Sequence, residues 1–129
     1  MTLEEIGIRA REVEPVIRVL PTAVKNQVLH KAAENLRMHT EEILRANVLD
    51  MEKGRERGMS AGLLDRLQLT DARVDGMAAG LEALADLEDP VGEVTGMKKR
   101  PNGLLIGQKR VPLGVVGIIY EARPNVTAD

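Results

Sequence analysis

The residues best suited to chemistry lie together near the carboxyl end of the sequence. Residues 120–127 carry a phenol, a carboxylate, a guanidinium, an amide and a hydroxyl on Tyr120, Glu121, Arg123, Asn125 and Thr127. They directly follow an apolar run, and ligands of open α/β sheets bind at the carboxyl ends of such strands. We therefore expect a binding or catalytic loop. The alternative is an ordinary polar loop in which Asn125 or Thr127 caps a helix.

The apolar run over residues 113–120 must position that loop. It has the composition of a strand buried on both faces, as in parallel α/β sheets. Parallel neighbours need crossover connections of a dozen or more residues, but only nine residues follow Tyr120. We therefore expect an N-terminal fragment that ends where the first β–α unit begins. Gly114 and Gly117 form no dinucleotide-binding fingerprint and would permit close backbone approach within the strand.

The sequence before residue 90 has helical periodicity. Apolar residues recur at spacings of three and four, which predicts four or five helices. Thr22, Thr40 and Thr70 are expected N-caps, and Pro15 predicts a kink or break at Glu14. After residue 90 the pattern changes. A turn at residues 102–103, Asn-Gly, predicts a β-hairpin between strands in residues 91–100 and 104–111.

Other polar residues have simpler interpretations. His30 and His39 lack metal-ligand spacing, and Asn47 falls on an apolar helical stripe, which favours a hydrogen-bonded buried amide. A basic cluster brackets the predicted turn. It would either protect the sheet edge by charge or contact an anion or another subunit; its members are Lys98, Lys99, Arg100, Lys109 and Arg110.

The composition restricts the function classes. The 129 residues have a net charge of −2, so no overall positive field favours nucleic acid or an anionic membrane. No apolar stretch approaches the ~18 residues that cross a bilayer. The sequence has no cysteine, which excludes disulfides, thiolate metal sites and a cysteine nucleophile within this chain. Tyr120 is the only aromatic residue, so the core must be aliphatic.

One long motif resembles a known family. Residues 111–127, Val-Pro-Leu-Gly-Val-Val-Gly-Ile-Ile-Tyr-Glu-Ala-Arg-Pro-Asn-Val-Thr, are similar to the signature that opens the cofactor domain of γ-glutamyl phosphate reductases. Shorter stretches at corresponding places are similar too, at residues 22–26, 62–67, 89–92 and 100–104. The resemblance covers essentially the whole chain, and its Tyr-Glu-x-Arg-Pro-Asn-Val-Thr string is specific.

This resemblance implies a truncated α/β fold of the aldehyde dehydrogenase superfamily. Residues 1–90 would be the N-terminal helical part of the cofactor domain, and residues 91–112 a β-hairpin of the oligomerisation type. Residues 113–129 would be the start of a Rossmann-type NADP-binding fold. The implied activity is NADPH-dependent reduction of L-glutamate 5-phosphate to glutamate 5-semialdehyde and phosphate, in proline biosynthesis. A cytoplasmic location, a homo-oligomer at full length and glutamate 5-kinase as a partner follow from the same resemblance.

The resemblance also implies roles for particular residues. Asn125 matches the asparagine whose side-chain amide stabilises the oxyanion in this superfamily. Ile118, Ile119, Tyr120 and Glu121 would flank the cofactor. The cysteine motif of the superfamily is absent here, so we expect this chain to be inactive alone. The alternatives are a non-catalytic helical interaction module and a regulatory relative that has lost catalysis.

Overall fold

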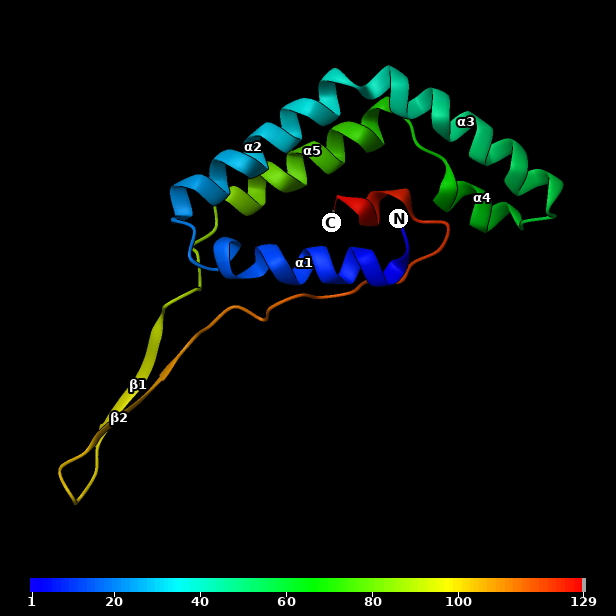
Figure 1. Ribbon diagram of the computed structural model, residues 1–129. Coiled ribbons are helices and arrows are strands. Elements are labelled where there is room, and N and C mark those ends of the chain that lie inside the picture. The colour runs from blue at the N-terminus through cyan, green and yellow to red at the C-terminus, as the bar shows by residue number, and fades with distance from the viewer. Residues whose placement is uncertain (129) are drawn as a thin grey trace. The chain divides into compact units, whose positions relative to one another are not determined.

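The computed structural model describes residues 1–128 as five α-helices, one β-hairpin and a short 3-10 helix (Figure 1). In chain order these are α1 (Leu3–Ile17), α2 (Thr22–Met38), α3 (Thr40–Glu56), α4 (Ala61–Leu67), α5 (Asp71–Ala85), β1 (Val94–Lys99), β2 (Leu105–Lys109) and η1 (Pro124–Thr127). These elements confirm the predicted helical region followed by a hairpin, and they fit a truncated α/β fold. No helix within residues 1–128 is both long and apolar enough to cross a membrane.

The described residues form two compact units. One consists of residues 1–22 and 88–117, and the other of residues 23–87 and 118–128. The second unit holds every buried side chain of the described residues. The domain boundaries expected from the sequence, at residues 90 and 112, stay a prediction.

The core of the second unit is small and aliphatic. Val74 and Ala78 on α5 and Ala33 on α2 are fully buried. Helices α2 and α5 lie side by side (Figure 1), and these small side chains are buried on them. Met51, Met77 and Ala85 complete the buried apolar set.

Asn47 joins α3 to the loop between α4 and α5. Its side-chain amide nitrogen donates to the carbonyl of Leu67 at 2.8 Å, and its oxygen accepts from the Leu69 amide at 2.7 Å. The residue is only 6% exposed. The predicted buried, hydrogen-bonded amide is therefore confirmed. It pairs two backbone groups that form no hydrogen bond within a helix, because they lie where the chain leaves α4.

The junction of α2 and α3 differs from the prediction. Thr40 is the first residue of α3, and its hydroxyl donates to the carbonyls of Leu36 and Arg37 at 3.1 and 2.9 Å. It therefore satisfies the last carbonyls of α2 instead of capping α3, so its predicted N-cap role is wrong. Thr70 is a true N-cap, accepting from the Arg73 amide at 3.2 Å.

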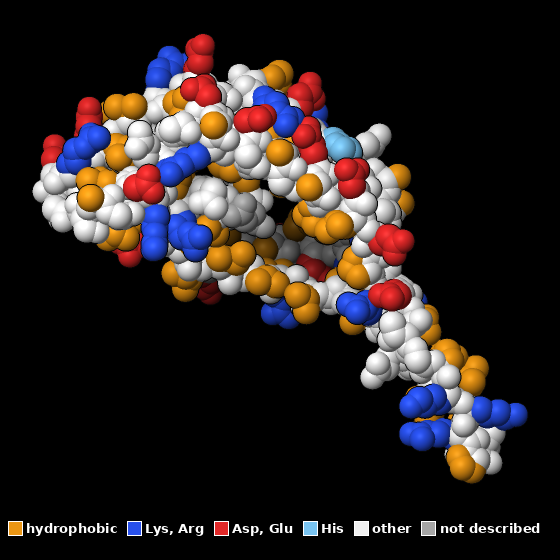
Figure 2. Space-filling model, turned by 180° about the vertical axis from the view of Figure 1, so that it is seen from behind, with side chains coloured by type: hydrophobic (Ala, Val, Ile, Leu, Met, Phe, Trp, Pro, Cys, Tyr) orange, Lys and Arg blue, Asp and Glu red, His pale blue; other side chains and the backbone are white. Residues whose placement is uncertain are grey.

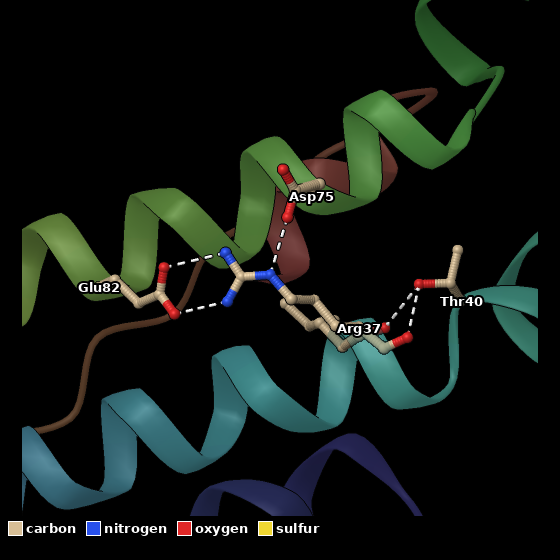
Figure 3. A network of polar contacts seen from close by, with 5 residues as sticks. Arg37, Thr40, Asp75 and Glu82 are labelled. Carbon is tan, nitrogen blue, oxygen red and sulfur yellow. Dashed lines mark hydrogen bonds and ion pairs between the residues drawn. The ribbon is translucent and has the colours of Figure 1, made fainter.

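Arg37 links α2 to α5 on the surface of the second unit (Figure 3). Its Nη1 and Nη2 donate to the two carboxylate oxygens of Glu82 at 2.5 and 2.9 Å, and its Nε donates to Asp75 at 2.7 Å. The bidentate bonds from Arg37 lower the pKa of Glu82 below its ordinary value, and bonds to Glu82 and then Asp75 raise the pKa of Arg37.

This network predicts an acid-dependent contribution to stability. Because the pKa of Glu82 is lowered in the folded state, the contribution is present above the ordinary glutamate pKa of about 4.5 and is lost as the pH falls below it. We expect Arg37→Met to lower the melting temperature at neutral pH, with a difference that shrinks toward about pH 3. Circular dichroism during thermal unfolding, repeated at several pH values between neutral and about pH 3, measures this difference in melting temperature.

Lys31→Met provides the matched control. Lys31 pairs with Glu34 at 2.7 Å. Both residues lie on α2, so removing this pair breaks no link between two helices. Such exposed pairs contribute little, so a small effect is expected. A melting-temperature difference for Arg37→Met that stays constant from neutral pH to acid would contradict the role of the Glu82 carboxylate.

In the first unit, α1 begins with a capping box. Thr2 accepts from the Glu5 amide at 3.2 Å, while the Glu5 carboxylate accepts from the Thr2 amide at 2.7 Å. Of the kink or break expected at Glu14, the break is wrong, because α1 continues through Pro15 to Ile17. The kink stays a prediction. Pro15 has no backbone N–H, so it removes one hydrogen bond from the last turns of α1.

The hairpin turns where the sequence predicted. The Gly103 amide donates to the Arg100 carbonyl at 2.9 Å, and Gly103 has a φ of 87° that favours glycine. The strands pair antiparallel, with a bulge between Thr95 and Lys98 where Gly96 takes a φ of 66°. Only Lys98, Lys99 and Arg100 lie beside the turn, where Figure 2 shows basic side chains. Lys109 lies opposite Val94 at the other end of the strands, and Arg110 pairs with Glu93 at 2.8 Å, so the structure divides the predicted cluster.

The run from Leu113 to Tyr120 differs from the prediction. None of these residues belongs to a strand, and all are exposed, with Leu113 at 93% and Ile119 at 103%. The expectation of a strand buried on both faces is therefore wrong for the described residues. A strand needs hydrogen-bonded neighbours, and the only sheet among residues 1–128 is the pair β1–β2.

Candidate functional site

The candidate site is built around the turn that leads into η1. Arg123 is the residue that precedes the first turn of η1, and Pro124 opens it with its φ already fixed for a helix. Ala122 takes a φ of 50°, a left-handed conformation uncommon for a residue with a side chain. The chain therefore reverses sharply just before Asn125.

A hydrogen bond closes this turn. The Tyr120 and Thr127 hydroxyl oxygens lie 2.5 Å apart, although the two residues are seven positions apart in sequence. This bond ties the end of the extended run to the last residue of η1. The tyrosine hydroxyl is thus already engaged, and its ring is the part available to a ligand.

A cavity of about 370 Å³ lies within the second unit, between η1, α4 and α5. We call it the arginine pocket because three guanidinium groups line it. Its lining residues are Asp65, Arg66, Gln68, Leu69, Arg73, Gly76, Met77, Arg123 and Asn125.

Arg73 holds one wall of the arginine pocket in place. It donates to the Asp65 carboxylate at 3.0 Å, to the Gln68 carbonyl at 2.6 Å and to the Asp65 carbonyl. The same loop is bound from the other side by Asn47, through Leu67 and Leu69. The loop between α4 and α5 is therefore fixed on both sides.

The structure separates the residues predicted from the sequence. Asn125 is half-buried and lines the arginine pocket, whereas Ile118, Ile119, Tyr120 and Glu121 are exposed and do not line it. Arg66 and Arg73 were not predicted from the sequence as site residues. The sequence shows only that they lie on either side of the loop at residues 68–70.

Known proteins match nearly the whole chain. A γ-glutamyl phosphate reductase of Halothermothrix orenii is 57% identical over 98% of the chain, and one of Moorella thermoacetica is 58% identical over 95%. Over these residues, the chain is similar to γ-glutamyl phosphate reductases. The resemblance stated from the motif at residues 111–127 is confirmed.

Solved γ-glutamyl phosphate reductases share the fold. The enzyme of Thermotoga maritima aligns over 98% of this chain with a TM-score of 0.90 and 48% identity. That of Saccharomyces cerevisiae aligns over 99% with a TM-score of 0.89 and 31% identity. No family model matches the chain. The chain spans about 30% of the length of the γ-glutamyl phosphate reductases that it matches.

Proposed function

We propose that this chain is the part of a γ-glutamyl phosphate reductase that supplies the oxyanion donor. The whole enzyme would reduce L-glutamate 5-phosphate with NADPH to glutamate 5-semialdehyde and phosphate, in the cytoplasmic synthesis of proline. The observation that carries the proposal is the placement of Asn125, the matching residue of the motif, in the arginine pocket.

Asn125 would act on the charge that develops at the substrate carbonyl. A cysteine thiolate, which this chain lacks, would attack the acyl phosphate carbon and leave a tetrahedral oxyanion. Collapse expels phosphate and gives a thioester. Reduction of that thioester passes through a second oxyanion, and its collapse releases the aldehyde and the thiolate. An amide that donates to this oxygen lowers both barriers.

The proposed cofactor segment, residues 118–121, combines apolar side chains with one carboxylate. Ile118, Ile119 and the Tyr120 ring are exposed apolar surfaces on which a nicotinamide or adenine ring could pack, and Glu121 could accept from a ribose hydroxyl. When bound, NADPH would supply the hydride. These four residues carry no cation, so the groups that bind its phosphates must lie elsewhere.

The hairpin supports an assembly role. Nearly all residues of β1 and β2 are exposed, both outer edges of this two-stranded sheet are unpaired, and basic side chains flank its turn. Another subunit could extend such an edge by strand pairing. We assign the hairpin to homo-oligomer formation in the whole enzyme, with glutamate 5-kinase as a further candidate partner.

A chimera tests the proposed function. We expect the 129-residue chain alone to give no turnover of NADP(H) with glutamate semialdehyde, because no cysteine is present to carry the acyl group. The chain grafted in place of the matching segment of the Moorella thermoacetica reductase is expected to restore NADPH-dependent reduction. Absorbance at the NADPH band measures both.

The controls are the native reductase and the same chimera carrying Asn125→Ala. A chimera that folds with native-like circular dichroism but has no activity would contradict the proposal and favour a regulatory or interaction module. Turnover by the isolated chain above a blank preparation would contradict the assignment of the nucleophile to another segment.

A further inference from the structure

The arginine pocket has a surplus of positive charge. Arg66, Arg73 and Arg123 line it together with a single carboxylate, that of Asp65. Arg73 already binds this carboxylate through Nη2 at 3.0 Å, and its Nη1 donates to two backbone carbonyls. Asp65 and Arg73 therefore neutralise each other, and two guanidinium charges remain.

Within residues 1–128, Arg66 and Arg123 have no partner that neutralises their charges. Neither forms an ion pair or side-chain hydrogen bond with any of residues 1–128. Arg66 lies on α4 and Arg123 directly before η1, so elements 57 residues apart in sequence bring them to one cavity. By contrast, Arg37 of the same unit forms ion pairs with Asp75 and Glu82.

The two unpaired guanidinium groups, of Arg66 and Arg123, favour binding of an anion. A guanidinium presents several N–H donors in a planar fork that matches carboxylate and phosphate oxygens, and two such forks on one cavity can share a ligand. A cavity of about 370 Å³ is within the size range of small-metabolite sites. Its exposed arginines keep their water until a ligand arrives, so the unpaired charges are tolerated.

We propose that Arg66 and Arg123 form a subsite for the carboxylate or phosphoryl group of a small acidic metabolite. This inference rests on the proposed function, whose substrate carries both groups. Asn125 lines the same cavity, so an anion bound by the two arginines would place the rest of the molecule near the proposed oxyanion donor. The arginines would thus contribute to substrate affinity and Asn125 to the rate.

Titration of the 129-residue chain tests this directly. Inorganic phosphate and L-glutamate are added separately at low salt, and binding is followed by amide chemical shifts. We expect saturable binding of at least one anion, with shifts at Arg66, Arg123 and Asn125. Arg66→Gln and Arg123→Gln should each weaken it about tenfold, because each removes charge-assisted hydrogen bonds.

Arg57→Gln is the matched control. Arg57 is an exposed arginine of the same unit that lines none of its described cavities, so its loss should change affinity less than about twofold. Tighter binding of phosphate would assign a phosphoryl subsite, and tighter binding of glutamate a carboxylate subsite. Absence of saturable binding of both anions, or equal weakening by Arg57→Gln, would overturn the proposal.

Kinetics of the active chimera separate this inference from the proposed function. Arg123→Gln should raise KM for L-glutamate 5-phosphate with little change in kcat, and Arg123→Lys should restore part of the affinity. An unchanged KM would overturn the subsite. An inactive chimera would contradict the proposed function while the phosphate and glutamate titrations still decide the subsite.

Discussion

Replacing Asn125 with alanine in the active chimera is expected to lower kcat by about 10²–10³ with little change in KM. The amide would bond mainly to the oxyanion, which exists only in the transition state, so its removal leaves substrate binding intact. Steady-state kinetics with varied L-glutamate 5-phosphate measure the two constants separately.

The competing interpretation makes Asn125 a structural residue. A lost helix cap costs about 0.5–2 kcal/mol of stability and leaves chemistry unchanged. The structure puts Arg123, not Asn125, at the cap position of η1, with no side-chain cap bond there. Thermal unfolding of the same variant distinguishes the two roles. A lower melting temperature with near-normal kcat would make the asparagine structural.

Thr127→Val is the control for η1 itself. It removes the hydroxyl bonded to Tyr120 while leaving the Asn125 amide in place. We expect it to lower stability more than Asn125→Ala and to lower kcat less. If both variants lose the same activity, the shape of η1, and not the amide, would explain the loss.

Replacing Asn47 with leucine is expected to destabilise the second unit by about 2–4 kcal/mol, because it leaves two backbone groups unpaired. Those groups are the Leu67 carbonyl and the Leu69 amide, which Asn47 binds while only 6% exposed. Leucine is nearly isosteric, so lost volume is a minor factor. Urea unfolding followed by circular dichroism measures the change.

Asn35→Leu makes the same chemical change at an exposed position of α2 and should alter stability by no more than about 0.5 kcal/mol. Because Asn47 also fixes the loop beside the arginine pocket, Asn47→Leu should weaken anion binding even where the unit stays folded. Equal stability of the two variants would show that water satisfies the loop without Asn47.

Local patterns in the sequence determined the helices, the Thr70 cap, the hairpin turn and the resemblance to γ-glutamyl phosphate reductases. Each depends on residues close together in the chain: apolar spacing, a hydroxyl before a helix, or Asn102-Gly103 in a tight turn. The same local reasoning was wrong about a break at Pro15, because α1 continues past it to Ile17. It was also wrong for the run from Leu113 to Tyr120, because a strand requires partners that local sequence does not supply.

Only the tertiary structure showed the arginine pocket. By sequence, Arg66 and Arg73 belong to two successive helical segments, and Arg123 and Asn125 to a loop 50 or more residues further on. The packing of η1 on α5 brings them to one cavity, and the bond from Arg73 to Asp65 decides which charges stay unpaired. Contacts between residues so far apart depend on how helices pack, and periodicity carries no information about that.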